Sequence, residues 1–228
     1  MTTGPHVRAQ LPALQRVSTV EAVATTLRDQ ILDGNLPAGQ PLREADLSEQ
    51  LRVSRHSVRV ALSNLTHEGL VRHEPNRGAF VRDMSTHEIA DCYRLRSILE
   101  LEAARTLCGD TAALSRARAA VQRLVDTPTD SPWAAQREAD LAFHRELVDA
   151  LGSPLISRTY ESLMMELRLC FLVEGVKDKD PEVIAQTHVA LLEILESGDV
   201  DEAVRVLTEH LDSSRDDAIE ALRSRHEA

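Results

Sequence analysis

Four side chains in the second half of the 228-residue chain have the types and spacing of a metal site. Asp140 and His144 are four residues apart, so in a helix a carboxylate and an imidazole share one face. His188 and His210 each lie beside leucines, which directs them toward a helical core. An isolated histidine there is more often a core residue, yet three neutral imidazoles and one carboxylate suit a divalent transition metal. Spacing alone does not decide between a metal site and buried core histidines.

A second polar group begins a helical pattern near the N-terminus. Its hydrogen-bonding residues are Ser54, Arg55, His56, Ser57 and Arg59. A helix that enters the major groove of DNA needs donors of this kind near its N-terminus. Arg55 and Arg59 are one helical turn apart, and Val58, Leu62 and Leu65 give the opposite face an apolar surface. The group predicts a DNA-reading helix, with a solvated basic helix end as the alternative.

The surrounding pattern is helix, turn, helix and β-hairpin. Helices are predicted over 19–32, 44–51 and 55–69, a loop over 37–41, and strands over 71–73 and 79–81. Arg43 in the preceding loop, with Arg77 and Gly78 at the hairpin tip, are candidates for contacts to the DNA backbone. We therefore predict a winged helix-turn-helix domain over residues 17–82, preceded by a flexible tail over 1–16.

No strand pattern follows residue 86. Short breaks separate the predicted helices, which cover 86–108, 111–125, 133–151, 154–174, 181–197 and 200–225. Helices joined by short loops form antiparallel bundles. The predicted fold class is mainly α, in which an all-α bundle over 86–225 follows the small winged domain.

Charge divides the chain in the same place. Residues 1–83 hold ten arginines against nine acidic residues, a net charge of +1, whereas the remainder has a net charge of −12. Local charge governs attraction to phosphate, so only the first part is suited to DNA.

Three cysteines favour buried thiols in a reducing cytoplasm, and no apolar run reaches the ~20 residues of a membrane span.

Residues 19–82 resemble the DNA-binding domain of the GntR family of bacterial transcription regulators. The stretches that carry the resemblance are ILDGNLPAGQPLREADLSEQL, VSRHSVR and LTHEGLVRHEPNRGAFV. The sequence departs from the family pattern at His56, Ser57 and Val60, so the operator sequence does not transfer. The resemblance implies a cytoplasmic homodimer, most often a repressor, that binds double-stranded DNA at a near-palindromic operator.

Residues 86–222 resemble the FCD-type effector domain of the FadR branch of that family. The resemblance implies that Asp140, His144, His188 and His210 bind a divalent metal, zinc first, with nickel or manganese as alternatives. It also implies a small carboxylate effector bound against the metal, with Arg96 as a candidate contact. The alternative for Arg96 is a surface helix arginine paired with Glu100 four residues on.

Two other functions fit part of the sequence. A metal-dependent hydrolase would use the same cluster to activate water, with Glu100, Glu146 or Glu166 as a possible base. None of these stands in a motif such as HExxH, and a hydrolase leaves residues 47–81 unexplained. A helical protein-interaction module anchored to DNA would need no small ligand.

Overall fold

The computed structural model describes residues 18–174 and 180–227, so the tail predicted over 1–16 lies outside the described residues. The first three helices of the described residues are α1 (Thr19–Leu32), α2 (Glu44–Leu51) and α3 (Arg55–His67). Ser18 caps α1 by accepting a hydrogen bond from the Glu21 amide at 3.1 Å. Apolar residues at helical spacing in α1, such as Leu27 and Ile31, share one core with Leu65 of α3. This shared core holds α3, the predicted DNA-reading helix, against α1.

A three-stranded antiparallel sheet flanks these helices. Its strands are β1 (Pro41–Leu42), β2 (Val71–Glu74) and β3 (Gly78–Val81), in the order β1-β3-β2. β2 ends one residue after the predicted strand over 71–73, and β3 begins one residue before the predicted strand over 79–81. β1 was not predicted, because a two-residue strand has no periodicity of its own and forms only by pairing with Phe80 and Ala79, far along the chain.

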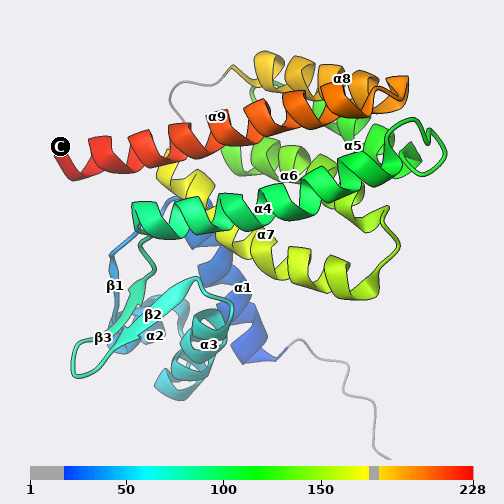
Figure 1. Ribbon diagram of the computed structural model, residues 1–228. Helices are drawn as coiled ribbons and strands as arrows, with labels where there is room; N and C mark the ends of the chain where they lie inside the picture. Colours follow the sequence, from blue (N-terminus) through cyan, green and yellow to red (C-terminus); the bar gives the residue numbers. More distant parts are fainter. Residues whose placement is uncertain (1–17, 175–179, 228) are drawn as a thin grey trace, which may run out of the picture.

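Six helices follow in the part of the chain that the structure describes, and the winged domain lies below them in Figure 1. They are α4 (Thr86–Leu107), α5 (Ser115–Asp126), α6 (Trp133–Asp149), α7 (Pro154–Glu174), α8 (Pro181–Ser197) and α9 (Val200–Glu227). α5 begins four residues later than predicted, because the Asp110 carboxylate accepts the amides of Ala112 and Ala113 and holds them in a turn. Among the described residues, no helix is long and apolar enough to cross a membrane.

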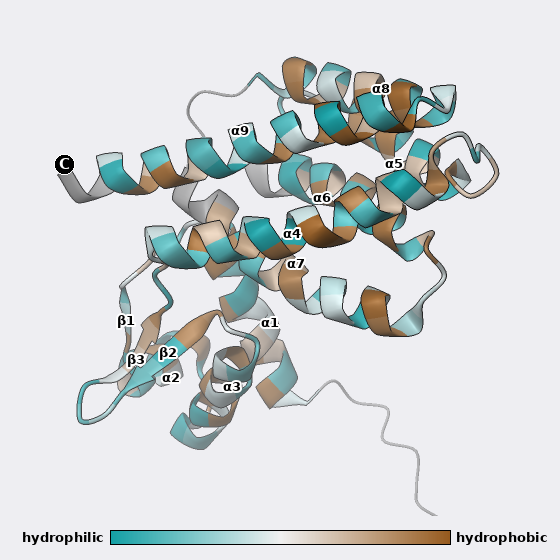
Figure 2. Ribbon diagram, in the orientation of Figure 1, coloured by the Kyte–Doolittle hydropathy of each residue, from teal (hydrophilic) through white to brown (hydrophobic). Residues whose placement is uncertain are grey.

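Two apolar cores organise the bundle. One contains buried residues of both the winged domain and the bundle, for example Val58, Ile89 and Leu163. The other lies among α4, α5, α6, α8 and α9, around Phe143 and Leu207. Figure 2 shows hydrophobic residues along the bundle helices, α8 among them, and hydrophilic residues at the hairpin tip. Because the first core crosses the domain boundary, the winged domain packs directly on the bundle.

Arg82, just after β3, joins the two parts with charged contacts. Its guanidinium donates to Glu166 of α7 at 2.8 Å and to Glu88 of α4 at 3.0 Å, and it lies 3.4 Å from the Gly69 carbonyl oxygen. Glu88 also closes a capping box with Ser85 at the start of α4. One arginine thus connects the wing, the end of α3 and two bundle helices.

Candidate metal centre and DNA-reading surface

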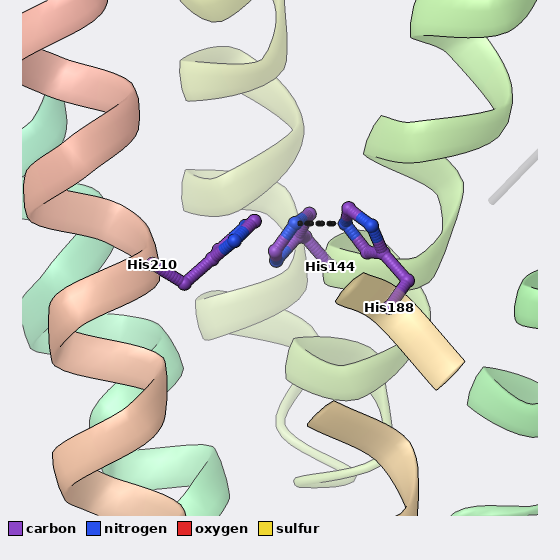
Figure 3. A group of neighbouring side chains, drawn as sticks. All are labelled: His144, His188 and His210. Atoms are coloured by element: carbon purple, nitrogen blue, oxygen red, sulfur yellow. Dashed lines mark hydrogen bonds between the residues drawn. The ribbon is translucent and has the colours of Figure 1, made fainter. Parts of the chain in front are cut away.

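Three helices direct histidines toward one point inside the bundle. His144 comes from α6, His188 from α8 and His210 from α9, and their rings face one another in Figure 3. Their possible ligand atoms all lie within 4.8 Å of one another. Asp140, one turn before His144, places a carboxylate oxygen 3.0 Å from Nε2 of His188. The structure therefore brings together all four residues that the sequence grouped.

The outer nitrogens of two histidines have fixed partners. Nδ1 of His188 lies 2.8 Å from the Ile184 carbonyl oxygen, which can only accept, so this nitrogen carries the proton. Nδ1 of His144 lies 2.7 Å from Glu100. Burial would raise the pKa of Glu100, but Arg96 and His144 hold it well below its ordinary value, so the ionised carboxylate also accepts. The ring of His144 is therefore held with Nδ1 as the donor, and Nδ1 of His188 likewise donates to the backbone.

These two Nε2 atoms face each other at 3.1 Å. A divalent cation between the two rings would be bound by both nitrogens. Burial lowers the pKa of His144. Burial, followed by the neighbouring charges, lowers the pKa of His210 well below its ordinary value. The rings of His144 and His210 are therefore neutral at neutral pH. Ligands at 2.0–2.1 Å from one zinc ion are about 2.9–3.4 Å apart. The 3.1 Å and 3.0 Å separations at His188 fit that range.

Behind the histidines lies a buried ionic network. Arg96 is 1% exposed and Glu100 fully buried, so the alternative of a surface arginine is wrong, although the i,i+4 pair forms with Nε 2.6 Å from the carboxylate. Tyr160 of α7 donates to the same carboxylate at 2.6 Å. Nη2 of Arg96 is buried and has no hydrogen-bond partner among the described residues. A buried guanidinium with a free donor beside a metal-type cluster suits an anion.

A cavity of about 500 Å³ leads from the surface to the cluster. Asp140, His188 and His210 line its inner end, and Arg137 lies in the same wall, 3.7 Å from Asp140. Sequence analysis missed Arg137, although its place three residues before Asp140 on α6 was a usable signal. It also missed Glu100 as the acceptor for His144, because 44 residues separate the two.

The predicted DNA-reading residues lie on one side of the winged domain. A groove between the start of α2, the face of α3 and the hairpin is lined by Arg43, Arg55, Arg59, Arg77 and Gly78. Ser54 and His56 are exposed and Ser57 half-buried at the first turn of α3. Four arginines converging on a concave surface suit a phosphate backbone, and the exposed start of α3 suits base edges.

Several of these side chains already have protein partners. The Ser54 hydroxyl caps α3 by accepting from the Ser57 amide at 3.1 Å, so part of its bonding capacity is used. Glu44 forms a two-pronged pair with Arg59, at 2.7 Å for the shortest contact, which lowers the pKa of Glu44. Arg77 pairs with Glu74 and lies over the Phe80 ring. Sequence analysis did not predict these pairs.

The sequence families that match the chain agree with this division. Residues 19–81 match the bacterial regulatory proteins of the gntR family, and residues 91–213 match the FCD domain. The chain belongs to the GntR family, with an FCD domain. Its members are transcription regulators and not enzymes, so the hydrolase alternative is wrong.

Individual relatives extend over nearly the whole chain. The HTH-type transcriptional repressor RspR of Escherichia coli K12 is 26% identical over 90% of both chains. The crystal structure of a GntR regulator from Rhodococcus sp. RHA1 is 29% identical, with a TM-score of 0.75 over 89% of this chain and 98% of that one. The FCD domain of TM0439, solved with Zn²⁺, shares the fold at 22% identity and a TM-score of 0.51, over 62% of this chain and 99% of that one.

Proposed function

We propose that this regulator is a repressor whose FCD domain holds a divalent metal and senses a small carboxylic acid. In this proposal residues 17–82 bind operator DNA and residues 86–225 bind the effector and mediate dimerisation. Two-fold dimers bring two recognition helices to successive major grooves of a near-palindromic operator. Exposed Leu95 and Ile98 on α4 offer apolar surface to a second copy. Because the target is chromosomal DNA, the protein acts in the cytoplasm.

One observation carries the metal assignment: the Nε2 atoms of His144 and His188 face each other at 3.1 Å beside the Asp140 carboxylate. Asp140 and His210 complete a three-histidine, one-carboxylate set. Such a set suits zinc first, with nickel or manganese as alternatives. The Zn²⁺-bound FCD domain of TM0439 has the same fold and supports this choice. When bound, the metal supplies a positive centre with open positions for an acid.

Arg96 supports an acidic effector. Its Nε is held by Glu100, while the buried Nη2 remains available to an effector carboxylate at the inner end of the site. The charge of Arg96 also lowers the pKa of His144 and of His210, which is consistent with a position near the cluster. Effector binding shifts the equilibrium between the DNA-binding and non-binding conformations only if the effector binds one of them more tightly than the other.

α9 and α4 provide the route between the sites. α9 carries His210 and lies along α4 (Figure 1). The first turn of α4 contains Glu88, which accepts a hydrogen bond from Arg82. A change in the position of α9 on effector binding therefore reaches the contacts that fix the winged domain. We propose that this movement changes the separation of the two recognition helices in the dimer.

Operator binding tests the DNA half. Operator DNA is recovered from random duplexes with the full protein, and affinity is then measured for Arg55→Ala. Removing a side chain that contacts a base costs about 1–3 kcal/mol, or roughly 5–150-fold in affinity. Arg123→Ala removes an equal charge from an exposed position on α5, away from the winged domain and from Leu95 and Ile98, and should leave affinity unchanged. Equal affinity of the Arg55 variant and the wild type would refute the assignment.

A further inference from the structure

Three sulfur-containing side chains meet at the junction between the winged domain and the bundle. Met84 belongs to the connector between β3 and α4, Cys92 to α4 and Cys170 to α7. The Sγ atom of Cys170 lies 3.8 Å from Sδ of Met84. Cys170 also forms a side-chain hydrogen bond with Cys92, so its thiol contacts both other residues. Two thiols and one thioether, from three separate segments, thus form one group, which we call the sulfur cluster.

The sulfur cluster is closed from solvent. Cys170 is fully buried, Met84 is 3% exposed and Cys92 is 9% exposed. All three belong to the apolar core that extends from the winged domain into the bundle. Cys108, in contrast, is half-buried at the end of α4 and packs against the other core. The chain therefore contains a cysteine outside the sulfur cluster that serves as a comparison.

The surroundings of Cys92 favour a bound cation. Its hydrogen bond with Cys170 lowers the pKa of the Cys92 thiol, although burial and the Glu166 carboxylate raise this pKa. A lower pKa favours the thiolate, which is the form of cysteine that binds metals. Among the charged groups that act on Cys92, Arg82 contributes one positive charge and Glu166 and Glu88 contribute two negative ones. The excess of negative charge attracts a cation and repels an anion.

The ligand atoms and their spacing indicate which cation fits. Three ligands that surround one ion in a plane, each about 2.3 Å from it, are about 4 Å apart. The distance of 3.8 Å between the sulfurs of Cys170 and Met84 is close to this value. Structural zinc takes four ligands, and the two carboxylates that act on Cys92 are already paired with Arg82. Thiolate and thioether ligands select the soft ion Cu(I).

We propose that Met84, Cys92 and Cys170 bind a single Cu(I) ion at the domain junction. The thiol protons leave to solvent when the ion binds. This site is separate from the histidine cluster, whose ligands come from α6, α8 and α9, and it does not rest on the proposed function. An ion bound there joins α4 and α7 to the connector that follows Arg82. Copper binding therefore fixes the segment through which the winged domain meets the bundle.

Anaerobic titration of the full-length protein with Cu(I), against a competing Cu(I) chelator, tests the site. Excess zinc is present throughout, so that the histidines are offered the ion proposed for them. The wild type should take up about one Cu(I) ion per chain. His188→Ala should take up the same amount, because this residue lies outside the sulfur cluster. Absence of uptake by the wild type, or loss of uptake in His188→Ala, overturns the proposal.

Variants of the sulfur residues assign the ligands. Cys92→Ser and Cys170→Ser should each weaken Cu(I) binding at least about tenfold, since loss of an outer partner alone costs 10–100-fold. Cys108→Ser is the matched control and should leave binding unchanged. Met84→Leu conserves volume and apolar character, so it keeps the fold even where serine does not, and it should weaken binding at least about threefold. Met165→Leu, a half-buried change on α7, is its control. Equal affinity of Met84→Leu and the wild type, or equal losses in the Cys108 and Cys92 variants, contradicts the proposal.

Discussion

Replacing Glu100 by glutamine tests the buried network that fixes the metal-binding tautomer. The change keeps the shape of the side chain and removes its charge. Arg96 then loses its anionic partner at a position that is 1% exposed. Removing one partner of a buried ion pair costs about 3–5 kcal/mol, because the other charge stays buried and uncompensated. Both side chains of the pair are almost completely buried, which favours the upper part of that range.

The same change affects metal binding through His144. An uncharged amide accepts a weaker hydrogen bond from Nδ1 than a carboxylate does, and its own NH₂ group competes for the position. Loss of such an outer partner reduces metal affinity about 10–100-fold. The variant should therefore be less stable without metal and bind zinc more weakly, since the two effects have one cause.

Circular dichroism melts in chelator and zinc competition against a chelating dye measure the two effects. For a chain of this size, 3–5 kcal/mol corresponds to a fall of about 6–20 °C in Tm. Glu102→Gln, two residues away on the exposed side of α4, is the matched control and should change neither quantity. A Glu100→Gln protein within 2 °C of the wild type and with unchanged zinc affinity would refute the argument from the buried pair.

Two further predictions concern the junction between the domains. Gly69 has a φ of +81°, and a Cβ there would lie 3.2 Å from the Arg82 guanidinium and 3.3 Å from Glu166. Gly69→Ala should therefore lower the urea midpoint more than Gly34→Ala, which has a φ of +76° and open space around it; equal losses would show that crowding at Arg82 contributes nothing. Hydrogen bonds from the Ser85 backbone and side chain lower the pKa of Glu88 from 4.5 to about 2. The unfolded chain then takes up this proton first, so the stability from Glu88 is present above pH 4.5 and is lost as the pH falls toward 2. Glu88→Gln should reduce the difference between urea midpoints measured at pH 5 and pH 3, and an unchanged difference would contradict this role.

Local sequence signals determined most of the fold. α2 begins and ends where it was predicted, whereas α3 ends at His67, two residues before its predicted end, and Gly69 follows in the left-handed conformation. Hydrophobic periodicity did not predict the start of α5, because the Asp110 side chain holds residues of helical character in a turn. Periodicity also did not predict β1, since only pairing with β3 makes this segment a strand.

The candidate site was predictable where one helix determines it. Asp140 and His144 share a face of α6 by spacing alone, and resemblance to a family joined them to His188 and His210. The depth of Arg96, the pairing of Glu100 with His144 and the place of Arg137 depend on how helices pack together, which no local pattern specifies. The same holds for the pair between Glu44 and Arg59, which joins α2 to α3.

The central claim is that the facing nitrogens of His144 and His188 hold a divalent metal. Its most direct test is elemental analysis of the full protein purified without chelator, followed by zinc titration of chelator-treated wild type and His188→Ala. We predict about one divalent ion per chain as purified, stoichiometric zinc uptake by the stripped wild type, and uptake weakened by at least about tenfold in the variant, which lacks one ligand. Less than a tenth of an ion per chain, with no uptake on titration, would contradict the account.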